Sequence, residues 1–192
     1  MPRGFTEIEK ENIRRMLLES CQASWKKYGY RHTSVDTLCL GAGISKGAFY
    51  KFFKSKEELF AETVKSIQDN IYDLVDGILK EEPNKYGYAR ALKVMYREQA
   101  KDPYLYDTSS TDFLCFMNKL SEQERSELSN NGLLRAEKVF QNPGLKVKIE
   151  KDKAMAVSIS LLNMVTYGDT LPYDSYQTFE YMVDKLIIEM FE

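Results

Sequence analysis

Apolar residues recur every three to four positions along most of the chain, and this spacing predicts helices throughout. The clearest stripe is formed by Ile13, Met16, Leu17, Cys21, Trp25 and Tyr28. Thr6 and Glu9 form a capping-box pattern before this stripe, and Gly29 ends it. Further helices are expected at about 34–42, 46–53, 55–82, 86–101, 104–120, 122–140, 152–168 and 174–191. No alternating strand pattern of useful length interrupts them, so the predicted fold is all-α with about nine helices.

Two short helical segments joined by a tight turn form the most informative pattern, at about 34–53. Val35 and Leu38, with either Cys39 or Leu40, supply the inner face of the first segment. Gly43 allows the positive φ that a sharp turn between helices requires. Three phenylalanines pack the second segment back, which leaves the following residues pointing outward: Ser45, Lys46, Gly47, Ala48, Tyr50 and Lys51. This outward set is small, basic or hydroxyl-bearing, and it suits close approach to a DNA duplex.

Charge is distributed unevenly along a chain whose net charge is only −2. Residues 1–60 hold 11 Lys and Arg against 7 Asp and Glu, whereas residues 61–192 hold 16 against 22. The N-terminal part is therefore basic and the rest of the chain is acidic. This distribution is typical of a protein that binds phosphate groups through one of its ends. On charge alone, a solvated basic face without function stays the alternative.

The N-terminal third resembles the DNA-binding domain of TetR/AcrR-type regulators. The residues that carry the resemblance are Trp25-x-x-x-Gly29-Tyr30, Thr33-Ser34-Val35, Ala42-Gly43-Ile44-Ser45-Lys46-Gly47 and Phe49-Tyr50-x-x-Phe53-x-Ser55-Lys56-Glu57-Glu58-Leu59. The similarity covers about residues 6–62. It implies a DNA-binding domain at 1–60, with three helices, and a helical effector-binding and dimerisation domain at 61–192.

The resemblance also implies which side chains meet DNA. The segment at 46–53 would lie in the major groove, where base edges differ in their donors and acceptors. Lys46 would contact a base or phosphate, Gly47 would permit close approach, and Ala48, where Thr is frequent in the family, could touch a thymine methyl. Ser45 belongs to the same face, and Tyr50 and Lys51 would hold phosphates. Thr33 and Lys56 would clamp the backbone at helix N-termini. Tyr50 could instead be an aromatic cap on the small core, and Lys51 could be merely solvated.

The last two predicted helices carry apolar residues on more than one side, so each must be covered on more than one side. Packing between two copies of the chain would achieve this, and burial in a single core is the alternative. We therefore expect a homodimer, which would match a palindromic operator. The residues predicted at the dimer interface are Ile159, Leu162, Phe179, Val183 and Leu186.

Residues 61–192 contain 10 of the 13 tyrosines and 6 of the 8 methionines, a composition that suits an apolar, aromatic-lined pocket. The predicted lining residues are Met95, Tyr96, Gln99, Phe113, Phe116, Met117 and Tyr167, with plain core packing as the alternative. The leading hypothesis is a dimeric repressor released from DNA by a small hydrophobic or aromatic effector of unknown identity. The alternative is a DNA-bound interaction protein without a ligand, with Tyr104 and Tyr106 on its partner surface. A cavity of a few hundred Å³ would favour the former.

The sequence carries no pattern typical of an enzyme, a metal-binding protein or a membrane protein. We find no nucleophile–base pair, metal-ligand spacing or phosphate-cradling glycine loop, so we predict no enzyme, cofactor or metal site. The lone His32 fits a surface loop. Residues 1–7 carry no apolar leader, no apolar run is long enough for a membrane span, and the three cysteines lack a CxxC pair, which favours a cytoplasmic location. A redox-sensing Cys115 is the alternative to three small apolar cysteines.

Overall fold

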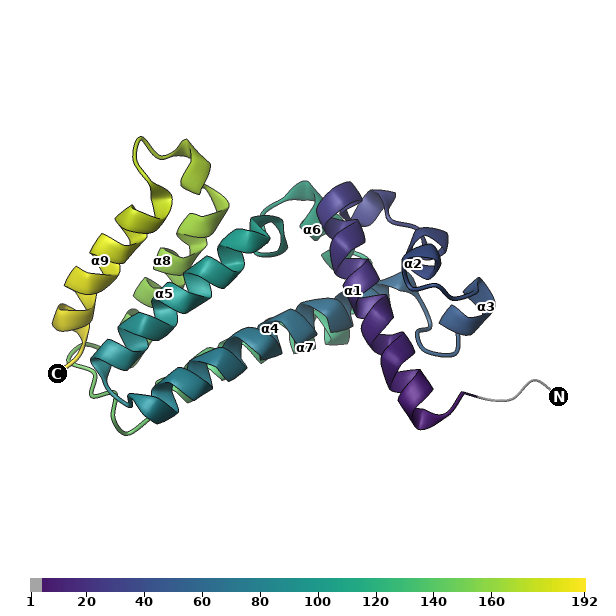
Figure 1. Ribbon diagram of the computed structural model, residues 1–192. Helices are drawn as coiled ribbons and strands as arrows, with labels where there is room; N and C mark the ends of the chain where they lie inside the picture. Colours follow the sequence, from purple (N-terminus) through teal and green to yellow (C-terminus); the bar gives the residue numbers. More distant parts are fainter. Residues whose placement is uncertain (1–4) are drawn as a thin grey trace. The chain divides into compact units, whose positions relative to one another are not determined.

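The computed structural model describes residues 5–192, and over this range it is built from α-helices and short 3-10 turns without a β-strand (Figure 1). The helices are α1 (Glu7–His32), α2 (Val35–Gly41), α3 (Lys46–Phe49), α4 (Lys56–Glu81), α5 (Lys85–Lys101), α6 (Thr111–Met117), α7 (Glu122–Val139), α8 (Lys151–Leu162) and α9 (Ser175–Met190). The predicted all-α fold is confirmed. Residues 1–4, on which the expected lack of a leader partly rested, lie outside the described residues.

Backbone contacts divide the chain into two compact units. The head unit comprises the chain up to Ser66 together with Ser109–Leu128, and the body unit comprises Ile67–Thr108 together with Ser129–Glu192. This differs from the expected division at residue 60, because α6 and the first part of α7 pack with the N-terminal helices. The chain therefore crosses between the units three times, after residues 66, 108 and 128.

The core of the head unit is an aromatic cluster. The ring of Trp25 lies 4.7 Å from that of Phe60 and 5.5 Å from that of Phe116, measured between centroids. Tyr30 stands edge-on to Phe60 at 5.1 Å. Phe60 and Phe116 are fully buried. Such aromatic pairs add roughly 0.5–1.5 kcal/mol each beyond the area that they bury. Helix α6 therefore contributes to the core of a unit whose first helix begins about 100 residues earlier.

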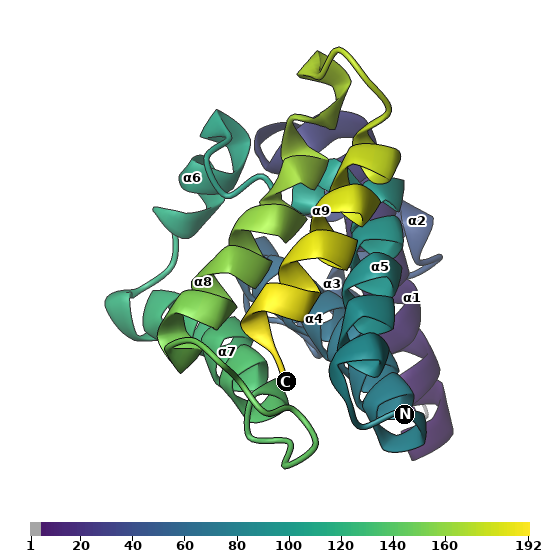
Figure 2. The same cartoon turned by 90° about the vertical axis from the view of Figure 1, so that its left-hand side faces the viewer.

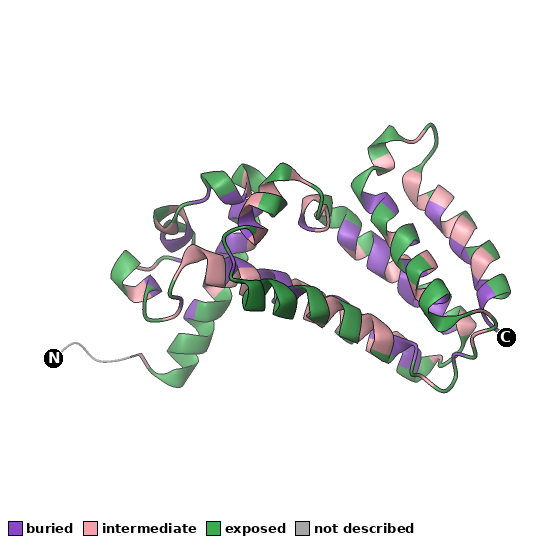
Figure 3. Ribbon diagram, turned by 180° about the vertical axis from the view of Figure 1, so that it is seen from behind, coloured by how far each residue is buried: buried purple, intermediate pink, exposed green. Residues whose placement is uncertain are grey.

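In the body unit, α5, α8 and α9 lie side by side (Figure 2). Phe179 of α9 is fully buried and stacks on Tyr96 of α5, with ring centroids 4.2 Å apart. Tyr88 stands edge-on to Phe191 at 5.3 Å. Figure 3 shows buried and exposed positions along the helices, as expected when one face of each helix packs inward.

Two expected helices are interrupted in the structure. The segment predicted at 104–120 forms a 3-10 turn, η1 (Pro103–Leu105), and then α6, because the Ser110 hydroxyl accepts a hydrogen bond from the Phe113 N–H and starts a new helix. The segment predicted at 152–168 forms α8 and then a second 3-10 turn, η2 (Asn163–Thr166). Periodicity alone did not reveal either break.

Three further features concern the other predictions. Within residues 5–192, no helix combines the length and apolarity needed to cross a bilayer, and no group of three His, Cys, Asp or Glu residues could hold a metal ion. The described cysteines are free; Cys21 and Cys39 are buried and Cys115 is half-buried. Burial raises the pKa of Cys21 to about 12, which keeps this thiol protonated at neutral pH.

Candidate DNA-binding surface and ligand cavity

The turn between α2 and α3 has the predicted geometry. Gly43 has a φ of +65°, and the Ile44 N–H donates to the Cys39 carbonyl at 3.0 Å. The Ser45 hydroxyl accepts from the Ala48 N–H at 3.2 Å and caps α3. Of the two residues left open for the inner face of α2, Cys39 is buried, whereas Leu40 is 84% exposed. The helix-turn-helix thus presents the N-terminal end of α3 to solvent.

Lys46 and Gly47 lie at this exposed end. The Lys46 ammonium lies 3.1 Å from the Asp36 carboxylate of α2, which raises the pKa of the lysine through a hydrogen bond and through opposite charge. A Cβ added to Gly47 would meet no atom within 4 Å. No packing within the described chain requires a glycine there, and its helix-weakening cost of up to ~1 kcal/mol is consistent with space kept for a partner.

The remaining predicted residues of this face lie around the same end. Tyr50 packs edge-on against Phe49 at 5.3 Å while its side of the helix stays open, so that the residue is 53% exposed. Lys51 is exposed, with its ammonium 5.5 Å from the ring of Phe5. Ala48 is half-buried. The structure brings these residues together with Lys46 and Gly47, and their contact with DNA stays a prediction.

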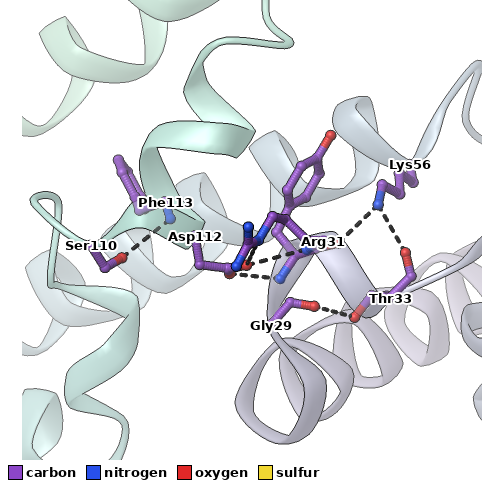
Figure 4. A network of polar contacts seen from close by, with 8 residues as sticks. Gly29, Arg31, Thr33, Lys56, Ser110, Asp112 and Phe113 are labelled. Atoms are coloured by element: carbon purple, nitrogen blue, oxygen red, sulfur yellow. Dashed lines mark hydrogen bonds and ion pairs between the residues drawn. The ribbon is translucent and has the colours of Figure 1, made fainter.

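Thr33 and Lys56, expected as phosphate clamps, are instead used inside the head unit (Figure 4). Thr33 is buried, and its hydroxyl donates to the Gly29 carbonyl at 2.7 Å. The Lys56 ammonium donates to the carbonyls of Tyr30 and Thr33 at 2.8 and 2.9 Å and lies over the Tyr30 ring. Burial lowers the pKa of Lys56. The exposed hydroxyl nearest in sequence is that of Ser34, the N-cap of α2.

The C-terminal end of α1 is held by a carboxylate that the sequence analysis missed. Gly29 breaks α1 with a φ of +74°, and this leaves the next backbone N–H groups without helical partners. Asp112 of α6 accepts from the Tyr30 N–H at 2.6 Å and from the Arg31 N–H at 3.2 Å (Figure 4). No local sequence pattern predicts this contact, because Tyr30 and Asp112 are 82 residues apart in the sequence.

The body unit contains a cavity of about 270 Å³, lined by Gln68, Ile71, Tyr72, Met95, Gln99, Tyr106, Gly132, Leu133, Ala136 and Ile159. Two of the predicted lining residues, Met95 and Gln99, are among them. Phe113, Phe116 and Met117 are not, because they belong to the head unit, where the two phenylalanines pack on Trp25. Tyr96 is buried against Phe179, and Tyr167 is 46% exposed outside the cavity. Tyr106, expected on a partner surface, faces the cavity instead.

The predicted dimer-interface residues divide into two groups. Ile159 of α8 is 41% exposed, and Leu162 and Leu186 are half-buried. Phe179 and Val183 are buried within one copy of the chain, so they cannot form an interface surface. The exposed apolar positions on the outer side of α9 are Tyr181 and Ile188, which the sequence analysis did not single out.

Residues 17–63 match the family model described as bacterial regulatory proteins, tetR family. This stretch is similar to the N-terminal domain of that family. Among curated TetR-like relatives, the chain is 41% identical over 49 residues to the uncharacterised regulator YhgD of Bacillus subtilis, covering 26% of each protein. It is 30% identical over 69 residues to AcrR of Shigella flexneri, covering 36% of this chain and 32% of AcrR. The matches thus span only about a quarter to a third of these relatives.

A solved TetR-like fold covers nearly the whole chain. The regulator FadR of Bacillus subtilis, crystallised with stearoyl-CoA, superimposes with a TM-score of 0.66 at 16% identity, over 90% of this chain and 97% of FadR. At this identity the likeness establishes the fold alone. Both curated relatives are named as HTH-type transcriptional regulators.

Proposed function

We propose that this chain is a TetR-family regulator, a cytoplasmic, dimeric repressor that binds a palindromic operator and is released by a small hydrophobic or aromatic effector. The observation that carries the proposal is the exposed start of α3, where Lys46, the open Gly47 and Tyr50 share one face. Basic and small residues at the N-terminus of the second helix suit entry into the major groove. The family match over residues 17–63 supports the same reading.

Lys46 is the side chain that we expect to contact a base or a phosphate. Its ion pair with Asp36 lies at the surface, where such pairs are worth only about 0–1 kcal/mol, and both partners are more than half exposed. A phosphate or a guanine could therefore displace the carboxylate at small cost. Asp36 in turn disfavours anions at unspecific positions, which would sharpen the preference for a DNA site that fits.

The central experiment selects DNA from a random library with the full chain and then measures binding to the selected site. Lys46→Ala should weaken binding by about 1–3 kcal/mol and relax base preference if the lysine reads a base. Lys80→Ala, at an exposed position of α4 in the body unit, is the matched control and should bind normally. Equal affinity of wild type and Lys46→Ala across salt concentrations would refute this placement of α3.

Dimerisation is proposed through the outer side of α8 and α9. Ile188 and Tyr181 are exposed there, and Leu162 and Leu186 are half-buried. A two-fold pair would bury this apolar surface and match the symmetry of a palindrome. Ile188→Glu should give monomers in sedimentation experiments and leave the fold intact, because this residue is half exposed in the single copy. A monomeric wild type would overturn both the dimer and the palindrome.

The cavity supports an effector rather than the alternative, an interaction protein without a ligand. That alternative needs a solid body unit, whereas a cavity of about 270 Å³ lies among α4, α5, α7 and α8. FadR, which shares the fold, was crystallised with stearoyl-CoA, and this supports a ligand with an apolar part for such a body. An effector-release assay on the selected DNA tests this part separately from DNA binding.

Two stretches of chain offer a route from the cavity to the head unit. Helix α4 is continuous across residue 66, and residues 107–111 link the cavity residue Tyr106 to Asp112, which holds the end of α1. A ligand that moves either stretch would bias the head. Allosteric coupling of this kind is typically about 1–3 kcal/mol and is reciprocal, so the DNA must weaken effector binding by the same factor.

A further inference from the structure

The chemical character of the cavity narrows the class of effector, an inference that rests on the ligand-responsive part of the proposed function. A narrower pocket of about 40 Å³ adjoins the main cavity and shares four of its residues, Tyr72, Met95, Ala136 and Ile159. It leads toward Val75, Leu92, Val139, Phe140 and Met155. One side of the combined space is therefore almost wholly apolar.

The other side carries polar groups that lack a partner. Gln99 is 9% exposed and lines the cavity, yet its side-chain amide makes no hydrogen bond with any residue in the range 5–192. The hydroxyl of Tyr106, which also lines the cavity, has no hydrogen-bond partner in that range either. The polar atoms of both side chains therefore remain accessible from the cavity, where a ligand could replace the hydrogen bonds that water makes with them.

Neighbouring polar groups in the same walls are satisfied, so the region is not loosely built. The Tyr72 hydroxyl donates to the Gly132 carbonyl at 3.1 Å, and Gln68 accepts from the Asn131 amide at 3.1 Å. The Tyr88 hydroxyl of the narrow pocket donates to Ser158 at 2.9 Å. Gln99 and Tyr106 thus differ from these residues, because neither side chain forms a hydrogen bond within the range 5–192.

Charge argues against an ionic ligand. No Lys, Arg, His, Asp or Glu is among the described residues that line either pocket. Burial, together with the nearby carboxylates of Asp102 and Glu98, raises the pKa of Tyr106, so the polar side disfavours an added anion. A buried cation would need a carboxylate in contact with it, and an unpaired buried charge is strongly destabilising.

We infer that the effector is an uncharged amphipathic molecule whose amide, carbonyl or hydroxyl group bonds to Gln99 and Tyr106 while its apolar part fills the space beyond Tyr72 and Met95. An amide is the most complementary group, because it can donate to and accept from the Gln99 amide at once. This class differs from the acyl-CoA thioester found with FadR, whose phosphates carry charge.

The test compares four probes that are each built on a chain of about eight carbon atoms: octanamide, octanoate, octylammonium and octanoyl-CoA. Binding to the full-length protein is measured by calorimetry and by the shift of the thermal midpoint. Octanamide should raise the midpoint and bind at least tenfold more tightly than each charged probe.

Variants locate the contact. Gln99→Met should lower octanamide affinity at least tenfold and leave the thermal midpoint of the free protein unchanged or higher, because it removes a polar group that has no partner. Gln68→Met is the matched control: it lines the same cavity but breaks a formed hydrogen bond, so it should lower the midpoint and keep the preference for the amide. Tyr106→Phe, which removes only a hydroxyl, should weaken octanamide several-fold.

The outcomes separate this inference from the proposed function. Tighter binding of octanoate, octylammonium or octanoyl-CoA would overturn the uncharged class while leaving a ligand-responsive regulator. Binding of none of the four, or unchanged octanamide affinity in both Gln99→Met and Tyr106→Phe, would also overturn it. Failure of the wild type to bind any selected DNA would sink the proposed function without touching these ligand measurements.

Discussion

In the head unit, the backbone break at Gly29 is surrounded by groups that satisfy it, whereas in the body unit the Gln99 amide faces a cavity without a partner. Asp112, Lys56 and Thr33 all bond to the few residues that follow or include the break. The polar groups around the break in the head unit are thus hydrogen-bonded to one another, whereas the body unit keeps an unpaired side-chain amide at its cavity. Under the proposed function, the internally bonded groups lie in the unit that would meet DNA, and the unpaired groups lie in the unit that would bind a ligand.

The largest effect is expected from the aromatic cluster of the head. Phe116→Ala removes a fully buried ring that contacts Trp25, Tyr30 and Phe60, and it should lower the free energy of unfolding by about 3–5 kcal/mol. Leu114→Ala, on the exposed side of the same helix, is the control and should cost little. Urea denaturation followed by the fluorescence of Trp25, the only tryptophan, reports on the head directly. Equal losses for both variants would show that α6 is not part of the head core.

Asp112→Ala is expected to cause the second-largest loss in the free energy of unfolding. It removes the acceptor of two backbone hydrogen bonds, and bonds to a charged acceptor contribute about 1.5–3 kcal/mol each; because the carboxylate is 27% exposed, we expect a total of about 2–3 kcal/mol. Asp112→Asn keeps one acceptor oxygen and should lose less. The same fluorescence-detected denaturation measures both. A loss below about 0.5 kcal/mol for Asp112→Ala would mean that water replaces the carboxylate without cost.

Acid should loosen the head before the body. Burial acts to raise the pKa of Glu57, but hydrogen bonds from Tyr30, from its own backbone and from Ser55 outweigh it, so that the pKa is lowered. Hydrogen bonds from Thr6 and Ser121 likewise lower the pKa values of Glu9 and Glu124, and all three carboxylates belong to the head unit. A depressed folded-state pKa adds stability above the unfolded value, about 4.3 for Glu, and this stability is lost as the pH falls through the folded value.

The check is a titration from pH 6 to pH 3 that follows Trp25 fluorescence for the head and amide hydrogen exchange of α5 and α9 for the body. The head signal should change at the higher pH, and Glu57→Gln should reduce the pH dependence of that signal. Earlier loss of protection in α9 would contradict the comparison.

The smallest effects come from two tyrosines of the body unit. Tyr88→Phe deletes a buried hydroxyl that is bonded to Ser158 and should cost about 1 kcal/mol. Tyr106→Phe deletes one without a partner and should leave the stability of the free protein nearly unchanged. Thermal denaturation of the two variants side by side tests this difference. If Tyr106→Phe costs as much as Tyr88→Phe, the Tyr106 hydroxyl has a partner in solution, and the cavity is less open than described.

Local sequence patterns predicted the N-terminal helices of the head unit well, but they did not predict that α6 packs against these helices. Thr6 with Glu9, Gly43 and Ser45 each act on residues within a few positions, so the sequence revealed the cap of α1, the turn and the start of α3. Asp112 and Phe116 act across more than 80 residues, and no spacing rule reaches that far. Apolar Phe179 and Val183 marked the two-sided packing of α9, but a sequence does not tell burial inside one chain from burial between two.

The head unit is assembled from two separate stretches of chain, and this limits how genes for proteins of this fold can exchange that unit by recombination. A crossover placed just after the helix-turn-helix would bring in a new Trp25 and Tyr30 but leave the incoming domain to meet a foreign Asp112 and Phe116. A transplant of DNA preference between relatives therefore has to carry residues 109–128 along with the first 66, which requires three junctions in the gene instead of one. Point substitution on the exposed face of α3 needs no such coordination. Under the proposed function, a change at Lys46 or its neighbours would therefore alter DNA preference more easily than an exchange of whole head units.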